Sequence, residues 1–235
     1  MANLRKYIIP RAFRSEGGIR QTYGIIRHML YSYGWLKTMK EKKCLNAKGE
    51  PIPWFTYPAI DFLAQFDYSD KEVFEYGSGY STLFWSKRAK NVVAVESYKE
   101  WYEKIKQEVG SNVSMLLSSN DRHEYAEQIE KYGLFDIIVI DGIGESRVLC
   151  AELAKKHLRK GGMIILDNSD LWIKSAGVLR KESGLIQIDF TGFLPIISNA
   201  SSTSIFISRD FDFKHLLDHQ PHKSVGQPAA QWEEA

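Results

Sequence analysis

The stretch Val73–Thr82, VFEYGSGYST, most constrains the fold of this chain, because an apolar run enters a loop with two glycines. Glycine lets the backbone turn tightly and approach a ligand closely at Gly77 and Gly79. A second apolar run, Val92–Glu96, follows and ends in a carboxylate. The pattern predicts parallel strands with a ligand at their carboxyl ends, beside a helix N-terminus.

Two acids indicate what kind of ligand this edge binds. Glu75 directly precedes the glycines, where its carboxylate would repel the pyrophosphate of a dinucleotide and attract a ligand with ammonium and sulfonium groups. Ser81 and Thr82 follow where a dinucleotide-binding loop has its third glycine. Glu96 suits ribose hydroxyls in either case. The residues therefore favour a sulfonium nucleoside over a dinucleotide.

The loop resembles the first motif of the class I S-adenosylmethionine-dependent methyltransferases, over roughly residues 55–208. The resemblance implies that Glu75 holds the amino group of S-adenosylmethionine and that Glu96 binds its ribose. Ser97 would lie near the adenine, which one of Ser119 or Asn120 would touch. The predicted cofactor-binding residues are Glu75, Gly77, Gly79, Ser81, Glu96, Ser97, Ser119 and Asn120.

Apolar runs alternate with helical patterns from Val73 to Leu166, which predicts repeated βαβ units and five parallel strands. The runs are continuous, as in strands that are covered on both faces. Two further strands are predicted at Leu185–Phe190 and Ser204–Ser208. The expected fold class is α/β, a Rossmann-like seven-stranded, mostly parallel sheet with helices on both faces, and in the resembled family the last strand is antiparallel.

Charge divides the chain into a basic start and a mildly acidic remainder. Residues 1–50 hold 11 Lys and Arg against three acids, and the remainder holds 20 against 26. We expect a basic helical leader at 1–50, the methyltransferase domain at 51–210 and a polar C-terminal tail at 211–235. The leader is interpreted either as a solvated arm or as a contact for an anionic partner, including a peripheral membrane contact.

The overall properties of the sequence predict a cytoplasmic protein. Its two cysteines, Cys44 and Cys150, form no disulfide framework, and no apolar run approaches the length of a membrane span or a secretory signal. The catalytic body is net acidic and has no basic patch, so nucleic acid is not expected as a partner.

A second resemblance concerns the ends of the fourth and fifth strands. The segments Phe135–Asp141 and Gly161–Asn168 resemble the cation-dependent O-methyltransferases of the catechol and caffeoyl-CoA type. That resemblance implies a divalent cation such as Mg²⁺ on Asp141, Asp167 and Asn168. Asp141 is the predicted catalytic base, directly or through a metal, and the other candidates are Glu145, His215, His219 and His222. The chain departs from the pattern at Gly144, where the relatives have a catalytic lysine. The alternative is that both aspartates are ordinary strand-end acids.

The predicted function is O-methylation of a small molecule or of a sugar or glycan precursor. Two alternatives stay open: an NAD-type oxidoreductase, and a non-catalytic protein that binds the cofactor or a membrane through a methyltransferase fold. Trp54–Tyr57 is interpreted either as a wall of the pocket or as core, and Arg147 either as a contact for an acidic acceptor or as a surface arginine.

Overall fold

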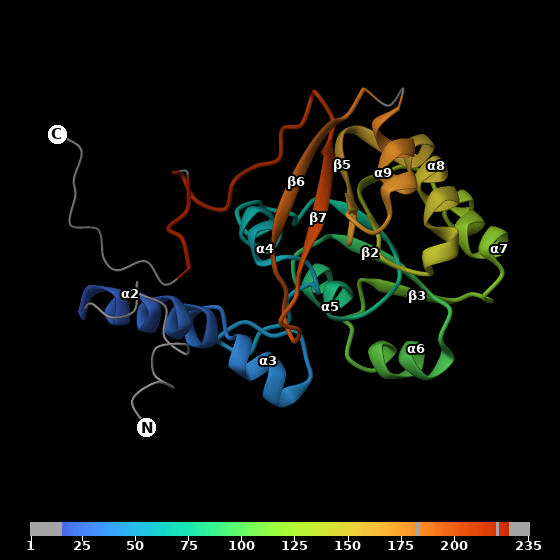
Figure 1. Cartoon of the computed structure of the whole chain (residues 1–235). Helices are drawn as coiled ribbons and strands as arrows, with labels where there is room; N and C mark the ends of the chain where they lie inside the picture. The colour runs from blue at the N-terminus through green and yellow to red at the C-terminus, as the bar shows by residue number, and fades with distance from the viewer. Residues whose placement is uncertain (1–15, 182–183, 220, 226–235) are drawn as a thin grey trace.

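A seven-stranded sheet forms the centre of the computed structural model (Figure 1), which describes residues 16–181, 184–219 and 221–225. The spatial order of its strands is β3-β2-β1-β4-β5-β7-β6. In sequence the strands are β1 (Glu72–Tyr76), β2 (Asn91–Glu96), β3 (Val113–Leu117), β4 (Phe135–Ile140), β5 (Leu158–Leu166), β6 (Ile186–Phe193) and β7 (Ala200–Ile207).

The first five strands pair in parallel, and β7 lies antiparallel between β5 and β6. The predicted Rossmann-like, mostly parallel sheet is therefore confirmed. Because parallel strands share a direction, β1, β2, β4 and β5 all end at one edge of the sheet.

Helices connect the strands and cover both faces of the sheet (Figure 1). Local capping explains where several begin. Pro58 opens α4, where its missing N–H costs nothing, and the Asp121 side chain caps α7 by accepting from the N–H groups of His123 and Glu124. The helices are α2 (Glu16–Arg27), η2 (His28–Ser32), α3 (Trp35–Glu41), α4 (Tyr57–Leu63), α5 (Tyr80–Ser86), α6 (Lys99–Lys106), α7 (Arg122–Ala126), η3 (Glu127–Lys131), η4 (Gly144–Ser146), α8 (Arg147–His157) and α9 (Ile173–Arg180).

Alternate residues of each central strand enter two separate cores. In β4, Ile137 and Val139 pack with α4, α5 and the leader, whereas Ile138 and Ile140 pack with α7, α8 and α9. All four side chains are fully buried. This double coverage explains why the strands are continuous apolar runs with no polar face.

Several elements differ from the bounds that the sequence pattern predicts. The pattern predicts a helix at about 122–132, which divides into α7 and the 3-10 helix η3, and a fifth strand at Met163–Leu166. Strand β5 begins at Leu158 instead of Met163, because Leu158 pairs with Phe135 ahead of an irregular step in the ladder. The β6–β7 hairpin extends beyond the predicted strands as far as the pair Phe193 and Ala200.

Both flanking segments contribute to the body of the fold. In the leader, Cys44 and Leu45 are buried in the core that also contains α4. After β7, Phe213 is 5% exposed, and the Lys214 carbonyl accepts a 2.8 Å hydrogen bond from the Asp67 N–H. The chain therefore returns across the body beyond residue 210. Among the described residues, no helix has the length and apolarity needed to span a bilayer.

Gly77 allows the end of β1 to pass close to the end of β4. Its φ is +92°, and a Cβ there would lie 3.0 Å from both the carbonyl carbon and the carbonyl oxygen of Asp141. We expect Gly77→Ala to lower the free energy of unfolding by about 1–3 kcal/mol, because the backbone is strained and the contact is with backbone. Chemical denaturation measures it.

Gly24→Ala is the matched control for Gly77→Ala. Gly24 lies in α2, and a Cβ there would meet nothing within 4 Å. Alanine there should leave stability unchanged or raise it by up to about 1 kcal/mol. Equal effects at both positions would contradict the close approach at Gly77.

Candidate active site

The loop between β1 and α5 is held in place by β2 and α6. The N–H of Gly77 donates to the Val95 carbonyl at 2.9 Å. Both the N–H and the hydroxyl of Ser78 donate to Glu96, and the indole N–H of Trp101 donates to the Ser78 carbonyl at 2.6 Å. The glycine loop is thus fixed on both sides before any ligand binds.

Glu75 lies beneath this loop and is completely buried. Its Oε2 accepts a 2.5 Å hydrogen bond from the Thr82 hydroxyl, whose oxygen in turn accepts from the Gly79 N–H. Its Oε1 has no hydrogen-bond partner within the described part of the chain. Burial raises the pKa of Glu75 to about 8, although the hydroxyls of Ser81 and Thr82 oppose the shift. Glu75 is therefore a carboxyl group with one unsatisfied oxygen at the end of β1.

Glu96 uses both of its oxygens within the protein. Oε2 accepts from the N–H of Ser78 at 3.1 Å and from its hydroxyl at 2.8 Å. Oε1 accepts from the backbone N–H groups of Ser97 and Tyr98 at 2.8 and 2.9 Å. A ribose hydroxyl that hydrogen-bonds to Glu96 would have to replace the Ser78 hydroxyl as a donor. Ribose binding at Glu96, as predicted, would therefore change how Glu96 holds the glycine loop.

The remaining predicted cofactor residues divide into two groups. Gly79 and Ser81 line the cavity described below, whereas Ser97, Ser119 and Asn120 do not. The Ser119 hydroxyl donates to Glu124 at 2.5 Å on an exposed surface. The assignment of adenine to Ser97 and to Ser119 or Asn120 stays a prediction.

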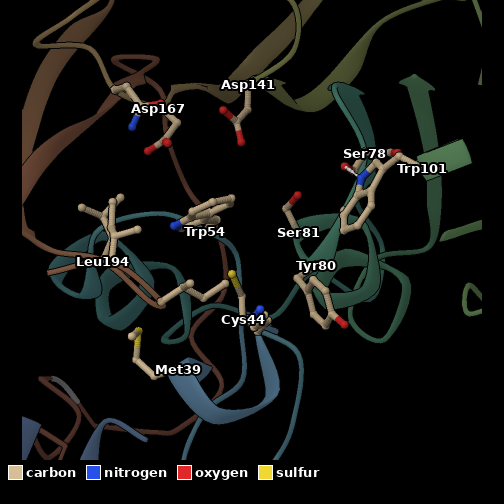
Figure 2. A pocket seen from close by; sticks show the side chains of 15 residues that line it. Met39, Cys44, Trp54, Ser78, Tyr80, Ser81, Trp101, Asp141, Asp167 and Leu194 are labelled. Atoms are coloured by element: carbon tan, nitrogen blue, oxygen red, sulfur yellow. Dashed lines mark hydrogen bonds between the residues drawn. The ribbon is translucent and has the colours of Figure 1, made fainter. Parts of the chain in front are cut away.

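The cavity lies at the carboxyl ends of the strands and has a volume of about 750 Å³. Figure 2 shows Asp141 and Asp167 pointing into it from one side, with Met39, Cys44 and Tyr80 on the other. The full lining is Met39, Lys42, Cys44, Trp54, Ser78, Gly79, Tyr80, Ser81, Trp101, Asp141, Asp167, Asn168, Leu194, Ile196 and Ile197. The sheet edge, the leader and the β6–β7 connection therefore build one cavity together.

Arg147 connects the ends of β4 and β5. Its Nη2 donates to Asp141 Oδ1 at 2.9 Å, its Nη1 to the Asp167 carbonyl at 2.7 Å and its Nε to the Gly142 carbonyl at 3.2 Å. The residue is 5% exposed. Arg147 is therefore a buried cation bound to Asp141 and to the Asp167 backbone, and not a surface arginine; its contact with an acidic acceptor stays a prediction.

The two aspartates have different electrostatic surroundings. Burial raises the pKa of Asp141, and the guanidinium of Arg147 opposes that shift. Burial and the nearby Asp141 carboxylate raise the pKa of Asp167 well above its usual range. Asp167 Oδ1 accepts a 2.6 Å hydrogen bond from the Thr203 hydroxyl. Two adjacent carboxylates resist a double charge, and the guanidinium of Arg147 favours that charge on Asp141 over Asp167.

The residues at this edge do not fit the predicted divalent cation. Asp141 already has a cationic partner in Arg147, and a bound metal ion would lie close to that guanidinium and be repelled by it. Asn168 has a left-handed backbone, and its amide nitrogen lies 3.4 Å from the Ser201 hydroxyl. Within residues 16–181, 184–219 and 221–225, no group of three His, Cys, Asp or Glu side chains could hold a metal ion. The geometry supports the alternative of protein-bound aspartates.

Gly144 shows a related departure from the cation-dependent pattern. A Cβ at Gly144 would lie 2.3 Å from the ring of Trp172, so no side chain fits there. The same ring lies 5.0 Å from the Arg147 guanidinium. Trp172 therefore fills the space of the missing lysine and covers the cation.

A strained turn between β6 and β7 forms one wall of the cavity. Ile196 has a φ of +73°, and the Ile197 N–H donates to the Pro195 carbonyl at 2.8 Å, which closes a three-residue turn. A positive φ is costly for a β-branched residue. The turn is held by α3, where the Thr38 hydroxyl accepts from the Ile196 N–H at 2.9 Å and Trp35 Nε1 donates to the Ile197 carbonyl at 3.1 Å.

Sequence reasoning missed this wall because both of its halves come from outside the β/α repeats. Met39 and Cys44 lie in the leader, and Leu194 and Ile196 lie in the β6–β7 connection. Trp54 lines the cavity, which agrees with the interpretation of Trp54–Tyr57 as a wall of the pocket (Figure 2). Its neighbours Phe55 and Tyr57 are buried core residues, as the other expected.

Comparisons with known proteins address the fold. No family model and no curated protein matches the sequence. Precorrin-6y C5,15-methyltransferase from Geobacter metallireducens has a similar structure at a TM-score of 0.52, with 15% identity over 64% of this chain and 87% of that one. Precorrin 8w decarboxylase from Methanobacterium thermoautotrophicum also gives 0.52, with 18% identity over 71% and 97%. The chain has the class I methyltransferase fold. At these identities the likeness shows the fold alone.

Glu75 predicts a specific pH dependence of stability for this methyltransferase fold. The folded state holds its proton up to about pH 8, whereas an unfolded glutamate loses it near pH 4.3. Stability from this group is thus fully present below the unfolded pKa and is lost as the pH rises through the folded pKa. Glu75→Gln should remove a slope of up to about 1.4 kcal/mol per pH unit between pH 5 and 8. Urea denaturation across pH measures it, and parallel curves for the two proteins would contradict it.

Thr38→Val tests the hold of the leader on the strained turn. Valine keeps the shape of the buried Thr38 side chain and removes the acceptor for the Ile196 N–H. We expect a loss of about 1–3 kcal/mol in the free energy of unfolding, the cost of leaving a donor without its partner. Thr22→Val is the control, because the Thr22 hydroxyl only donates to Gly18 within α2. It should change stability by less than about 0.5 kcal/mol.

Proposed function

We propose that this chain is an S-adenosylmethionine-dependent methyltransferase that methylates an oxygen of a small molecule or of a sugar or glycan precursor. One observation carries the proposal: the glycine loop and the ends of β4 and β5 border a single cavity that contains Asp141. Its volume of about 750 Å³ lies within the range typical of small-molecule sites.

The residues present fit the methyl donor. Glu75 has a buried oxygen without a partner, and an ammonium group bound there would hydrogen-bond it and lower its raised pKa, so that Glu75 ionises on binding. Gly79 and Ser81 line the cavity beside it, and Glu96 holds Ser78 at the loop. These residues would hold the amino-acid end and the ribose, and the class I fold provides the same placement at the strand ends.

S-adenosylmethionine supplies a methyl group on a sulfonium, which needs no further activation. The chain therefore has to orient the acceptor, exclude water and remove one proton. Asp141 Oδ1 is bound by Arg147, so Oδ2 is the oxygen that takes the proton of the acceptor hydroxyl. Its raised pKa makes Asp141 a stronger base than an ordinary aspartate, and Arg147 keeps it ionised.

The acceptor would lie against the wall formed by the leader and the strained turn. Trp54, Leu194, Ile196 and Ile197 give this side of the cavity an apolar surface, while Asp141 and Asp167 provide its polar side. A compact acceptor with an apolar face and a hydroxyl fits these surroundings, and a nucleic acid does not.

The sheet order argues against the NAD-type alternative. A dinucleotide-binding sheet has the order 3-2-1-4-5-6, whereas here antiparallel β7 lies between β5 and β6.

Calorimetric titration with S-adenosylhomocysteine tests the proposal. We expect micromolar binding that Mg²⁺ does not change. Glu96→Ala should weaken it by about 1–3 kcal/mol, since it removes a charged hydrogen-bond acceptor and releases Ser78. Glu103→Ala, an exposed change in the adjacent helix α6, should leave the affinity unchanged.

Each other outcome has a defined meaning. A folded protein that binds NADH and not S-adenosylhomocysteine would establish the oxidoreductase alternative. Binding without methyl transfer to any of a panel of phenols, catechols and polyols would favour the non-catalytic alternative. An affinity that Glu96→Ala leaves unchanged would show that the ribose assignment to β2 is wrong.

A further inference from the structure

Helix α2 presents apolar side chains to solvent. It packs mainly against η2, the turn that follows it, and projects away from the sheet (Figure 1). Ile19, Tyr23 and Ile26 recur at helical spacing on one face, and they are 59%, 67% and 51% exposed. Ile25 next to them is 68% exposed. Such a face is unusual on a helix in water and marks a contact with another phase or partner.

The helix also needs a partner for its own stability. It has 12 residues and contains Gly17, Gly18 and Gly24, each of which disfavours a helix relative to alanine. Isolated helices of this length are marginal in water, and most helical stability comes from packing an amphipathic face. The apolar face of α2 therefore has a structural reason to be covered.

Charge indicates which occupant fits. Residues 16–41, from the start of α2 to the end of α3, contain four Lys or Arg (Arg20, Arg27, Lys37 and Lys40) against Glu16 and Glu41 at their two ends. Arg20 and Arg27 lie together on α2, beside the apolar face and not within it. A helix with isoleucine and tyrosine on one side and arginine flanking it matches the boundary of an anionic bilayer, with the aromatic rings at headgroup level.

The same charges disfavour other partners for the apolar face of α2. Residues 1–15 carry four Lys or Arg and no acid, so they would meet the cationic leader with like charge. A second copy of the chain would bring the same cationic face against itself. A nucleic acid would match the charge and leave the isoleucines uncovered. We propose that α2 docks the protein on an anionic lipid surface, with Ile19, Tyr23 and Ile26 inserted at the interface.

The docking face is continuous with the cavity wall. Helix α2 leads through η2 to α3, which supplies Met39 to the cavity and Thr38 to the strained turn. Docking would hold this part of the leader at the membrane and bring the mouth of the cavity near the lipid headgroups. The proposal itself does not depend on methyl transfer, because its test uses lipid binding.

Co-sedimentation of the full chain with vesicles tests the proposal. We expect binding to vesicles of equimolar phosphatidylglycerol and phosphatidylcholine and none to pure phosphatidylcholine. Arg20→Glu with Arg27→Glu should lower the partition coefficient by at least about tenfold, since each basic residue contributes appreciably near a charged surface. Ile19→Asp with Ile26→Asp should lower it by at least about tenfold as well, because the inserted apolar face is lost.

Matched controls distinguish loss of the α2 face from a general change in net charge or hydrophobicity. Lys155→Glu with Lys156→Glu makes the same charge change on α8, which packs against the other face of the sheet. Leu134→Asp changes an exposed leucine before β4. Both should bind vesicles within about twofold of the original protein. All variants should keep the thermal midpoint, because α2 lies outside both cores.

Three results would overturn the proposal. One is no binding to the anionic vesicles by a folded protein. Another is full retention of vesicle binding by both α2 double variants. The third is that Ile19→Asp with Ile26→Asp abolishes a stable dimer in solution, or abolishes RNA binding seen in place of vesicle binding. A lost dimer would assign the face to a second copy of the chain, and lost RNA binding would assign it to RNA.

Discussion

Four carboxylates lie at one edge of the parallel sheet, and the surrounding chain has to pair them or hydrogen-bond to them. Glu75, Glu96, Asp141 and Asp167 end four neighbouring strands, and all but Asp141 are at least nine-tenths buried. Buried carboxylates are costly unless they are paired or hydrogen-bonded. Each one therefore fixes a piece of the surrounding chain, and those pieces together form the cavity.

The partners of these carboxylates determine what each can still do. Both carboxylate oxygens of Glu96 accept hydrogen bonds within the protein, from Ser78 and from the backbone just before α6. Glu96 therefore holds the glycine loop without a ligand. Glu75 keeps one oxygen free, which is the feature that an ammonium group would satisfy. Arg147 lies 2.9 Å from Asp141 and opposes the rise in pKa that burial causes there. The carboxylates at this edge therefore differ in how far the protein itself satisfies them.

Much of the fold could be predicted from the sequence, because its signals are local. Continuous apolar runs such as Phe135–Ile140 specify covered parallel strands, and the carboxylates that follow them specify the active edge. The wall of the cavity could not be predicted in this way. Thr38 and Ile196 are 158 residues apart, and nothing in either segment indicates that they share a hydrogen bond. The φ of +73° at Ile196 is opposite to the preference of isoleucine, so only tertiary contacts can impose it.

The predicted cation site illustrates why a strand-end pattern alone does not define its chemistry. Asp141, Asp167 and Asn168 stand at the expected positions, yet the charge they require comes from Arg147, six residues after Asp141 on the next helix. Trp172 covers that guanidinium and fills the space beside Gly144. A guanidinium supplies positive charge without the open coordination positions of a metal ion, so these strand ends hold an ion pair where the resemblance implied a ligand set. Arg147 therefore favours the ionised form of Asp141 while burial raises the pKa of that carboxyl, and the balance between the two depends on how completely the cavity excludes water.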